Sequence, residues 1–276
     1  MVNKARRITQ TKKIGHLGTL DPIATGVLPL VIGRATRLAR YYTECDKIYE
    51  GTVRFGWSTD TYDRAGTPTS PAVEPRIEAA ALEGYLERFR GEILQTPPPV
   101  SAKKVAGRRA YELARQSVAV ELEPVRVHFY ELTLLDWDGS RGRLRAHCSA
   151  GTYVRSLAHD LGQLAGCGAH LEDLRRVLSG EFEIGQARTI AQLESLAAEE
   201  RLWDAVIPPA AMLPGFPAVY LDELTTAQVR QGRNFPASPF RSQPATRFVK
   251  AVTGKQELVA IGEAVLPNLY HPVTVL

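Results

Sequence analysis

The sequence predicts an α+β protein in which a large mixed domain precedes a small β-rich one. Residues 125–136 and 143–149 each alternate apolar and polar side chains, and the Asp138-Gly139 turn between them favours an antiparallel hairpin. Helical patterns occur on both sides of this hairpin, so strands and helices are interspersed along the chain. The residues after 215 contain short strands and many turn residues but little helix, as in a small β-barrel.

Hydrophobic periodicity and chain-breaking residues define the elements of the large domain. The 3.6-residue period is clearest at 76–89, and strand-like alternation is clearest at 47–57. Aspartate, glycine and proline indicate a loop at 59–71, and three successive prolines interrupt regular structure at 97–99. In order, we expect a basic helix at 3–13, a loop and strand through Val31, a helix at 34–43, the strand at 47–57, the helix at 76–89, a short helix at 110–116, the hairpin, and helices at 153–165 and 189–200.

The end of the large domain is marked by a helix start and a proline-rich linker. Thr189 precedes the last helical pattern and suits an N-cap, because its hydroxyl can accept a hydrogen bond from the first turn. Prolines then cluster between residues 208 and 217. We therefore expect a large domain at 1–210 and a second, small domain at 215–276.

The charge of the chain suggests a polyanionic partner. The formal net charge is +4 and the isoelectric point is near 9.0, which is mildly basic. The cations are clustered, and clusters suit phosphate contacts, although a solvated charged face is an equally good interpretation of each. The clusters are Lys4, Arg6, Arg7, Lys12 and Lys13; Lys103, Lys104, Arg108, Arg109 and Arg115; and Arg230, Arg233, Arg241, Arg247 and Lys250.

Several classes of protein are disfavoured. Cys45, Cys148 and Cys167 lie far apart without metal-ligand spacing, so we expect neither a zinc site nor a disulfide framework. The first residues are basic and polar, unlike a signal peptide. No apolar run approaches the ~18 residues of a membrane span. The sequence thus predicts a soluble, cytoplasmic protein without membrane contact.

The most informative segment is residues 15–30, GHLGTLDPIATGVLPL, with Asp21 at its centre. Glycine and proline at this density fix a tight, non-repetitive backbone, and the apolar run behind them anchors the loop. Such a loop can present a catalytic carboxylate. Taken alone, however, an aspartate followed by a proline, as at Asp21-Pro22, is also common in ordinary turns.

This segment resembles the catalytic motif of the TruB family of tRNA pseudouridine synthases. AGTYVRSL at 150–157 is similar to the family's GTYIR motif. The resemblance implies a pseudouridine synthase fold, with a central, mainly antiparallel mixed sheet flanked by helices, and a C-terminal PUA-like RNA-binding β-barrel. It also implies isomerisation of uridine to pseudouridine at position 55 in the TΨC loop of tRNA, on a flipped-out nucleotide and without a cofactor or metal.

The resemblance implies that Asp21 is the catalyst, either by attack on the sugar C1′, by attack on the base, or by removal of a sugar proton. Arg155 would be its cationic partner, since a guanidinium offers two parallel donors to a carboxylate. Tyr49 would be the active-site tyrosine, which can stack on uracil and move a proton. Without the resemblance, Arg155 would be interpreted as a surface residue and Tyr49 as core packing.

Five further residues are expected to bind substrate. Tyr153 and Leu174 match positions that wall the base pocket. His16 matches the motif histidine and is expected to contact the surroundings of the flipped nucleotide. Lys104 and Arg176 are candidates for phosphate contacts.

The sequence departs from the family pattern at its start. Family members normally have a strand and a Lys-Pro motif ahead of the first helix, whereas this chain begins at Met1-Val2-Asn3-Lys4. A missing strand would expose a sheet edge, so we expect lower thermal stability than in a full-length member.

The resemblance implies a stand-alone synthase that acts on the tRNA TΨC stem-loop as a monomer, and three other functions are alternatives to it. A guide-RNA-dependent synthase of the dyskerin type shares the aspartate motif, but the bacterial style of the motif and the basic stretch at 101–115 favour an enzyme without guide RNA. A non-catalytic RNA-binding protein is conceivable for a shortened chain. A glycoside hydrolase needs two carboxylates across the sugar, and this segment offers only Asp21.

Overall fold

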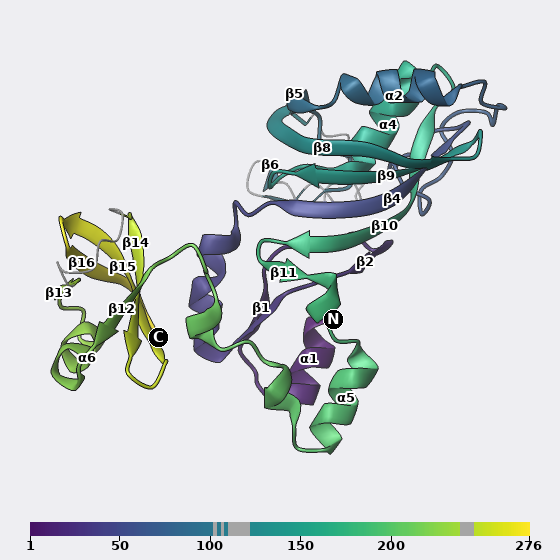
Figure 1. The fold of residues 1–276 in the computed structure, drawn as a ribbon. Coiled ribbons are helices and arrows are strands. Elements are labelled where there is room, and N and C mark those ends of the chain that lie inside the picture. Colours follow the sequence, from purple (N-terminus) through teal and green to yellow (C-terminus); the bar gives the residue numbers. More distant parts are fainter. Residues whose placement is uncertain (102–103, 106–107, 110–121, 238–245) are drawn as a thin grey trace. The chain divides into compact units, whose positions relative to one another are not determined.

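The computed structural model describes residues 1–101, 104–105, 108–109, 122–237 and 246–276 (Figure 1). They form two compact units, and each unit is assembled from more than one segment of the chain. The sheet unit contains residues 19–28 and 44–186, and the second unit contains residues 1–18, 29–43 and 187–276. The boundary expected between residues 210 and 215, which would separate the two predicted domains, stays a prediction. None of the helices in these ranges has the length and apolar character needed to cross a membrane.

The sheet unit is built on one seven-stranded sheet, in the order β11-β10-β4-β9-β8-β5, with β2 beside β10. Every pairing is antiparallel except that of β2 with β10. The mainly antiparallel mixed sheet expected from the sequence is therefore confirmed. The strands are β2 (Ala24–Gly26), β4 (Lys47–Phe55), β5 (Gly91–Gln95), β8 (Val125–Trp137), β9 (Arg141–Cys148), β10 (Ala169–Ser179) and β11 (Phe182–Glu183), and β6 (Lys104–Val105) pairs separately with β7 (Arg108–Arg109).

Two helices, α2 (Ala79–Glu87) and α4 (Val154–Leu164), contribute residues to the same hydrophobic core as the sheet. Leu82 and Leu86 of α2 and Leu157 of α4 are fully buried together with Phe55 and Phe129 of the sheet. Burying large apolar side chains stabilises a fold by about 1.5–3 kcal/mol each. This shared cluster fixes α4, the helix that carries Arg155, against the sheet.

The predicted hairpin is confirmed as β8 and β9, and its turn has a clear physical cause. Gly139 has a φ of 95°, which a glycine adopts without a steric penalty. The Asp138 Oδ1 accepts hydrogen bonds from the backbone N–H groups of Ser140 at 2.8 Å and Arg141 at 2.7 Å. An aspartate that binds the backbone in this way favours a turn over a continuing strand.

The sequence-based assignment was wrong at several elements. The strand expected through Val31 is divided at Pro29 into β2 and β3 (Leu30–Ile32), which belong to different units. The helix expected at 34–43 is a 3₁₀ helix, η1 (Gly33–Tyr42). The elements that were missed include the strands β5 and β10 and the helix α6 (Glu223–Arg230). The short helix expected at 110–116 lies outside the described residues.

The second unit contains the elements at both ends of the chain. Thr189 caps α5 as expected, because its hydroxyl accepts from the Gln192 N–H while the Gln192 side chain accepts from the Thr189 N–H. Besides β3, η1 and α6, its elements are α1 (Val2–Thr9), β1 (Ile14–His16), α5 (Ile190–Ala198), η3 (Leu202–Ala205), η4 (Pro209–Ala211), β12 (Ala218–Leu221), β13 (Phe235–Pro236), β14 (Phe248–Thr253), β15 (Leu258–Leu266) and β16 (Leu269–Val275).

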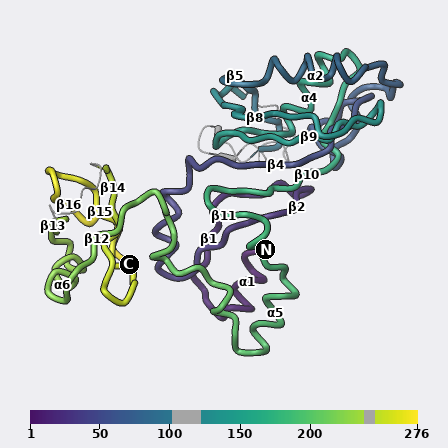
Figure 2. Tube along the Cα trace, viewed as in Figure 1, coloured from purple at the N-terminus to yellow at the C-terminus, as the bar shows by residue number. Residues whose placement is uncertain are grey.

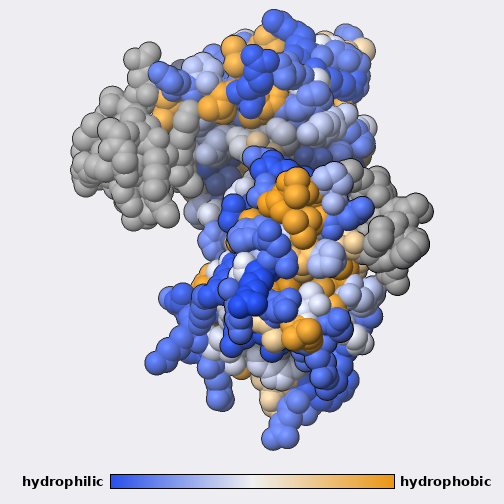
Figure 3. All heavy atoms as spheres, turned by 90° about the vertical axis from the view of Figure 1, so that its left-hand side faces the viewer, coloured by the Kyte–Doolittle hydropathy of each residue, from blue (hydrophilic) through white to orange (hydrophobic). Residues whose placement is uncertain are grey.

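The C-terminal strands form a five-stranded half-barrel sheet, in the order β12-β14-β15-β16-β13. Its core includes the fully buried Phe235, Val249 and Ala260, with Val229 of α6 packed among them. This agrees with the small β-domain that the sequence predicts. Figure 3 shows one face of the molecule, where hydrophilic side chains predominate and hydrophobic ones form separate patches.

Candidate active site

The loop that carries Asp21 is attached to the sheet by β2. Figure 2 shows β2 and β10 side by side, although they are far apart in the sequence. Gly26 pairs with Arg176, and the Val27 N–H donates to the Arg176 carbonyl at 2.9 Å. Gly26 has a φ of 100°, and a Cβ there would lie 2.1 Å from the Arg176 carbonyl oxygen. Only glycine therefore fits at this position without displacing the backbone.

Arg176 holds the same loop at two points. Its Nε donates to the Val27 carbonyl at 2.9 Å and its Nη1 to the Thr19 carbonyl at 3.3 Å, so it binds the chain on both sides of Asp21. The side chain is buried, with 1% of the residue exposed. Arg176 was expected to contact phosphate, which requires a side chain at the surface, whereas this side chain is buried. The reason is that β10, which the sequence did not reveal, turns Arg176 towards the loop.

Gly26→Ala is expected to destabilise the protein by about 2 kcal/mol or more, because the new Cβ meets β10 backbone and the positive φ is strained. Urea unfolding measures this change. Gly84→Ala is the matched control, since Gly84 lies in α2 with open space around it and alanine favours a helix by about 1 kcal/mol. Equal stability of Gly26→Ala and the wild type would contradict the close approach of β2 to β10.

Asp21 is bound by Arg155 through two hydrogen bonds. The Nε of Arg155 donates to Oδ2 of Asp21 at 3.0 Å, and its Nη2 donates to Oδ1 at 2.8 Å. Side-chain exposure is 4% for Arg155 but 28% for Asp21. A bidentate pair of this kind fixes the orientation of a carboxylate. The buried arginine therefore presents a carboxylate that solvent, and hence a substrate, can reach.

Arg155 has further partners that fix its guanidinium. Its Nη1 donates to the Thr61 carbonyl at 3.1 Å, and its Nη2 donates to the Val100 carbonyl at 3.0 Å. A second carboxylate, that of Asp63, has Oδ2 at 3.7 Å from Nη1. Arg155 lies in the first turn of α4, where the helix dipole disfavours a cation. The two aspartates offset this cost.

The start of α4 is held by a buried glutamine. The Gln95 Nε2 donates to the Tyr153 carbonyl at 3.0 Å, and its Oε1 accepts from the Tyr153 N–H at 2.8 Å. Next to it, the Ser156 hydroxyl donates to the Thr96 carbonyl at 2.6 Å. The segment before the three prolines thus positions the helix turn that carries Arg155.

Asp63 and Thr61 are site residues that the sequence reasoning missed. The Oδ1 of Asp63 accepts from the Thr61 hydroxyl at 2.8 Å and from the Ala65 N–H at 2.9 Å. These bonds leave Oδ2 directed towards Arg155. The aspartates between 59 and 71 indicated a loop, but nothing in the sequence distinguished a turn-forming aspartate from one that also faces the site.

Tyr49 on β4 pairs with Arg176, the residue that holds the Asp21 loop. Burial raises the pKa of its hydroxyl, while the charge of Arg176 and a hydrogen bond to it act in the opposite direction. A phenol with a raised pKa is neutral at physiological pH and can donate a proton. Leu174 is buried at 5% exposure and pairs with Gly51 of β4. Burial also raises the pKa of the Tyr153 hydroxyl.

The two remaining expected residues, His16 and Lys104, lie on short strands. His16 is exposed at the end of β1 in the second unit, and its Nδ1 accepts from the Gly18 N–H at 3.3 Å. Lys104 lies on β6, and its side chain lies outside the described part of the chain. Within the described ranges, no group of three or more histidine, cysteine, aspartate or glutamate side chains is arranged to hold a metal ion.

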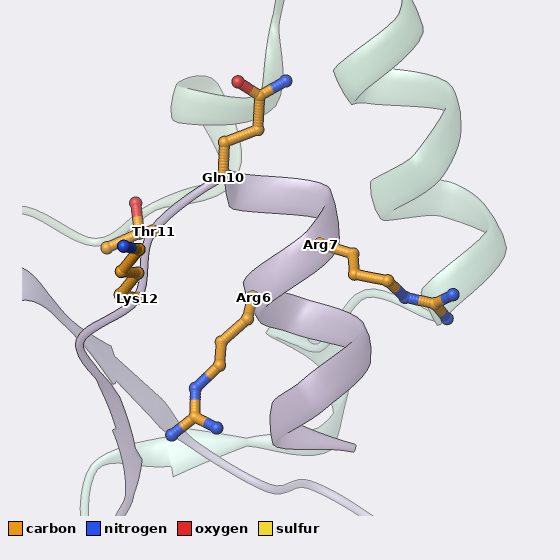
Figure 4. A pocket seen from close by; sticks show the side chains of 5 residues that line it. All are labelled: Arg6, Arg7, Gln10, Thr11 and Lys12. Carbon is orange, nitrogen blue, oxygen red and sulfur yellow. The ribbon is translucent and has the colours of Figure 1, made fainter.

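A basic hollow of about 490 Å³ lies at the end of α1 (Figure 4). Arg6, Arg7 and Lys12 supply three cations, and Gln10 and Thr11 complete the lining. Gln10 ends the helix with a φ of 52°, which turns Thr11 and Lys12 away from the helix axis. The hollow corresponds to the first basic cluster of the sequence, and its charge suits an anion.

Asp160 on α4 predicts a dependence of stability on pH. Burial raises the pKa of its carboxyl from 3.8 to about 6. The folded state therefore favours the protonated form, and this contribution is lost as the pH rises from about 4 through 6. Asp160→Asn should therefore raise the free energy of unfolding at pH 7.5 by about 1 kcal/mol, after allowance for solvent screening.

Urea unfolding between pH 4.5 and 8 tests this prediction. The advantage of Asp160→Asn should grow with pH and level off above the pKa of the folded state. Asp136→Asn on β8 is the control, because that side chain is exposed. A constant difference between Asp160→Asn and the wild type across the range would refute the burial effect.

The mixed sheet and the family models that match the chain place it in the class of pseudouridylate synthases, which are isomerases. The TruB family pseudouridylate synthase N-terminal domain matches residues 6–154, and the tRNA pseudouridylate synthase B C-terminal domain matches residues 155–213. The chain belongs to the TruB family.

Known proteins resemble the chain over nearly its full length. It is 70% identical to the tRNA pseudouridine synthase B of Solibacter usitatus over all of this chain and 94% of that protein. It is 40% identical to the enzyme of the same name from Dechloromonas aromatica, over 95% of this chain and 85% of that protein. The fold matches that in the crystal structure of the archaeal box H/ACA sRNP Nop10-Cbf5 complex, with a TM-score of 0.71 and 24% identity over 99% of this chain and 80% of the other.

Proposed function

We propose that this protein isomerises uridine to pseudouridine at position 55 in the TΨC loop of tRNA, with Asp21 as the catalyst on a flipped-out nucleotide. The observation that carries the proposal is the bidentate contact of the buried Arg155 with the partly exposed Asp21. The TruB relatives, which are named tRNA pseudouridine synthase B, support the choice of tRNA.

The chemistry assigns each group a role. The glycosidic bond from N1 breaks, the base turns, and C5 forms a bond to C1′, so the product is an isomer and no oxidant or reductant is consumed. Asp21 acts in its ionised form, and the guanidinium of Arg155 holds the carboxylate in a fixed orientation. Its attack on C1′, its attack on the base and its removal of a sugar proton all begin from that form.

We assign Tyr49 to the base and to its proton. Its ring offers an aromatic face, and its hydroxyl bonds to Arg176, the residue that holds the Asp21 loop. When C5 bonds to C1′, C5 loses its proton, and the Tyr49 hydroxyl can relay that proton by accepting it while its own proton passes to solvent. Leu174 and Tyr153 are proposed to wall the base pocket, Leu174 through its apolar surface and Tyr153 through its ring and hydroxyl.

Flipping the nucleotide selects the kind of RNA. Unstacking a base costs a few kcal/mol, and less in a loop than in a duplex. The hollow lined by Arg6, Arg7 and Lys12 supports binding of RNA phosphates. We propose that His16, Lys104 and the C-terminal half-barrel sheet also contact tRNA, and that the protein acts in the cytoplasm as a monomer, without guide RNA.

Tritium release from tRNA transcripts labelled at uridine C5 tests the function. The purified chain alone is expected to release about one tritium per tRNA, and none from a transcript with cytidine at position 55. Release that requires an added guide RNA would favour the guide-dependent class. Release from both transcripts alike would refute the assigned position. Binding of tRNA without release would favour a non-catalytic RNA-binding protein.

A further inference from the structure

The loop at 59–67 supplies two of the groups that hold Arg155, and one aromatic residue lies between them. Thr61 offers its carbonyl and Asp63 its carboxylate. Tyr62 has a φ of 62°, in the left-handed region that is uncommon for an aromatic residue. Such a conformation is strained and persists where other contacts compensate.

One such contact is a ring stack on α4. The rings of Tyr62 and His159 have centroids 3.8 Å apart and planes inclined by 9°. His159 follows Arg155 by four residues, so the two side chains lie on the same face of the helix. The stack therefore joins the loop that binds the guanidinium to the helix that carries it.

We propose that Tyr62 and His159 are positioning residues for Arg155, and that their stack holds Thr61 and Asp63 against its guanidinium. The consequence for catalysis rests on the proposed function, whereas the consequence for the folded protein does not. Neither ring needs to touch the substrate, because both act through Arg155 on the orientation of Asp21.

The surroundings of the pair support a fixed geometry. The Tyr62 carbonyl accepts from the Leu171 N–H at 2.9 Å, and the Arg64 N–H donates to the Leu171 carbonyl at 2.9 Å. These bonds fix the loop to β10 on both sides of Asp63, and the stack adds an attachment to α4. Burial lowers the pKa of His159, so its ring is neutral at physiological pH. Its Nδ1 is buried without a hydrogen-bond partner among the described residues, and its ring stacks on that of Tyr62.

An RNA-free experiment tests the coupling in the folded protein. Urea unfolding is measured for His159→Ala, for Asp63→Asn and for the double variant. Alanine favours a helix, so the first change removes the ring without breaking α4. Each variant changes the equilibrium constant for unfolding by a certain factor relative to the wild type. If the stack holds Asp63 in place, the factor for the double variant should differ at least about 5-fold from the product of the two single-variant factors. Additive effects would overturn the proposal.

A kinetic experiment tests the positioning itself. Under single turnover on tRNA, Tyr62→Ala and His159→Ala are each expected to lower the rate constant about 5- to 10-fold, with the Kd for tRNA changed by less than 2-fold. The double variant should be no slower than the slower single variant, because either change removes the same stack. Tyr62→Phe and His159→Phe keep an aromatic face and should restore most of the rate.

A second stack in the same unit provides the control. Tyr130 and His128 on β8 stack at 4.6 Å and 28°, and Tyr130 is 51% exposed. Tyr130→Ala and His128→Ala should keep the wild-type rate. Wild-type rates in the Tyr62 and His159 variants, weakened tRNA binding at an unchanged rate, or failure of the phenylalanine variants to recover would each overturn the proposal. An inactive wild type would instead refute the proposed function, and the unfolding experiment would still decide the coupling.

Discussion

Asp21→Asn is expected to abolish tritium release, with a fall in the single-turnover rate constant of at least about 10⁴-fold. The amide has nearly the same shape as the carboxylate but no charge, so it cannot act as an anionic catalyst at the sugar or the base. Its NH₂ group would also face the two Arg155 donors that now bind Oδ1 and Oδ2. Stopped single-turnover assays with an excess of enzyme measure the rate directly.

The same variant distinguishes catalysis from folding. Asp63 remains beside Arg155, so the guanidinium keeps one anionic neighbour and the fold should survive. We expect a Kd for tRNA close to that of the wild type and a loss of stability of about 1–3 kcal/mol. Asp136→Asn, the same change at an exposed position, should affect neither quantity. Release within about 10-fold of the wild-type rate would remove Asp21 from the mechanism.

Arg155→Lys is expected to lower the rate constant about 10²-fold, although it keeps the charge. A lysine has one ammonium group in place of the planar fork that binds Asp21, Thr61 and Val100 together. Asp21 would keep a cation nearby but lose its fixed orientation. The measurement is again the single-turnover rate, with Arg145→Lys on β9 as control, since Arg145 binds Glu50 at a partly exposed position.

Arg155→Met extends the test to stability. Removal of the guanidinium leaves the buried carboxylate of Asp63 and the partly exposed one of Asp21 without their shared cation, and breaking a buried ion pair costs about 3–5 kcal/mol. Urea unfolding should show this loss, together with a rate below that of Arg155→Lys. A methionine variant as stable as the wild type would mean that the ion pairs contribute nothing to folding.

The sequence predicted the parts of the fold in which local signals agree. The β8–β9 hairpin has a turn-forming aspartate and glycine, α5 has its cap at Thr189, and α2 and α4 have clear apolar faces. Each of these elements is specified by residues close to one another in the chain. Periodicity is sufficient for such elements.

The missing element, β10, shows the limit of local signals. Its burial pattern is irregular, because it pairs with β4 on one side and with β2 on the other, and it contains two register shifts. Charged residues therefore occupy buried positions, as Arg176 does, and the alternation that marks a strand is lost. The expected surface role for Arg176 followed from that gap.

The site itself could be predicted only in part. The resemblance identified Asp21 and Arg155, and the structure gives them a direct contact across 134 residues of sequence. Their catalytic roles, and those of Tyr49, Tyr153, Leu174, His16 and Lys104, remain predictions. Asp63 and Thr61 could not be recognised, because their importance depends on a loop that meets α4 only in the folded protein.

The parallel pairing of β2 with β10 also constrains the order of events during synthesis. The segment with Asp21 leaves the ribosome early, yet its anchor, Arg176, follows Val27 by 149 residues. Contacts between such distant segments form slowly and late in folding. Because chains are made from the N-terminus, a nascent chain that ends before β10 has no strand on which to attach this loop. The carboxylate of Asp21 is thus among the first parts of the sheet unit to be made and among the last to be fixed.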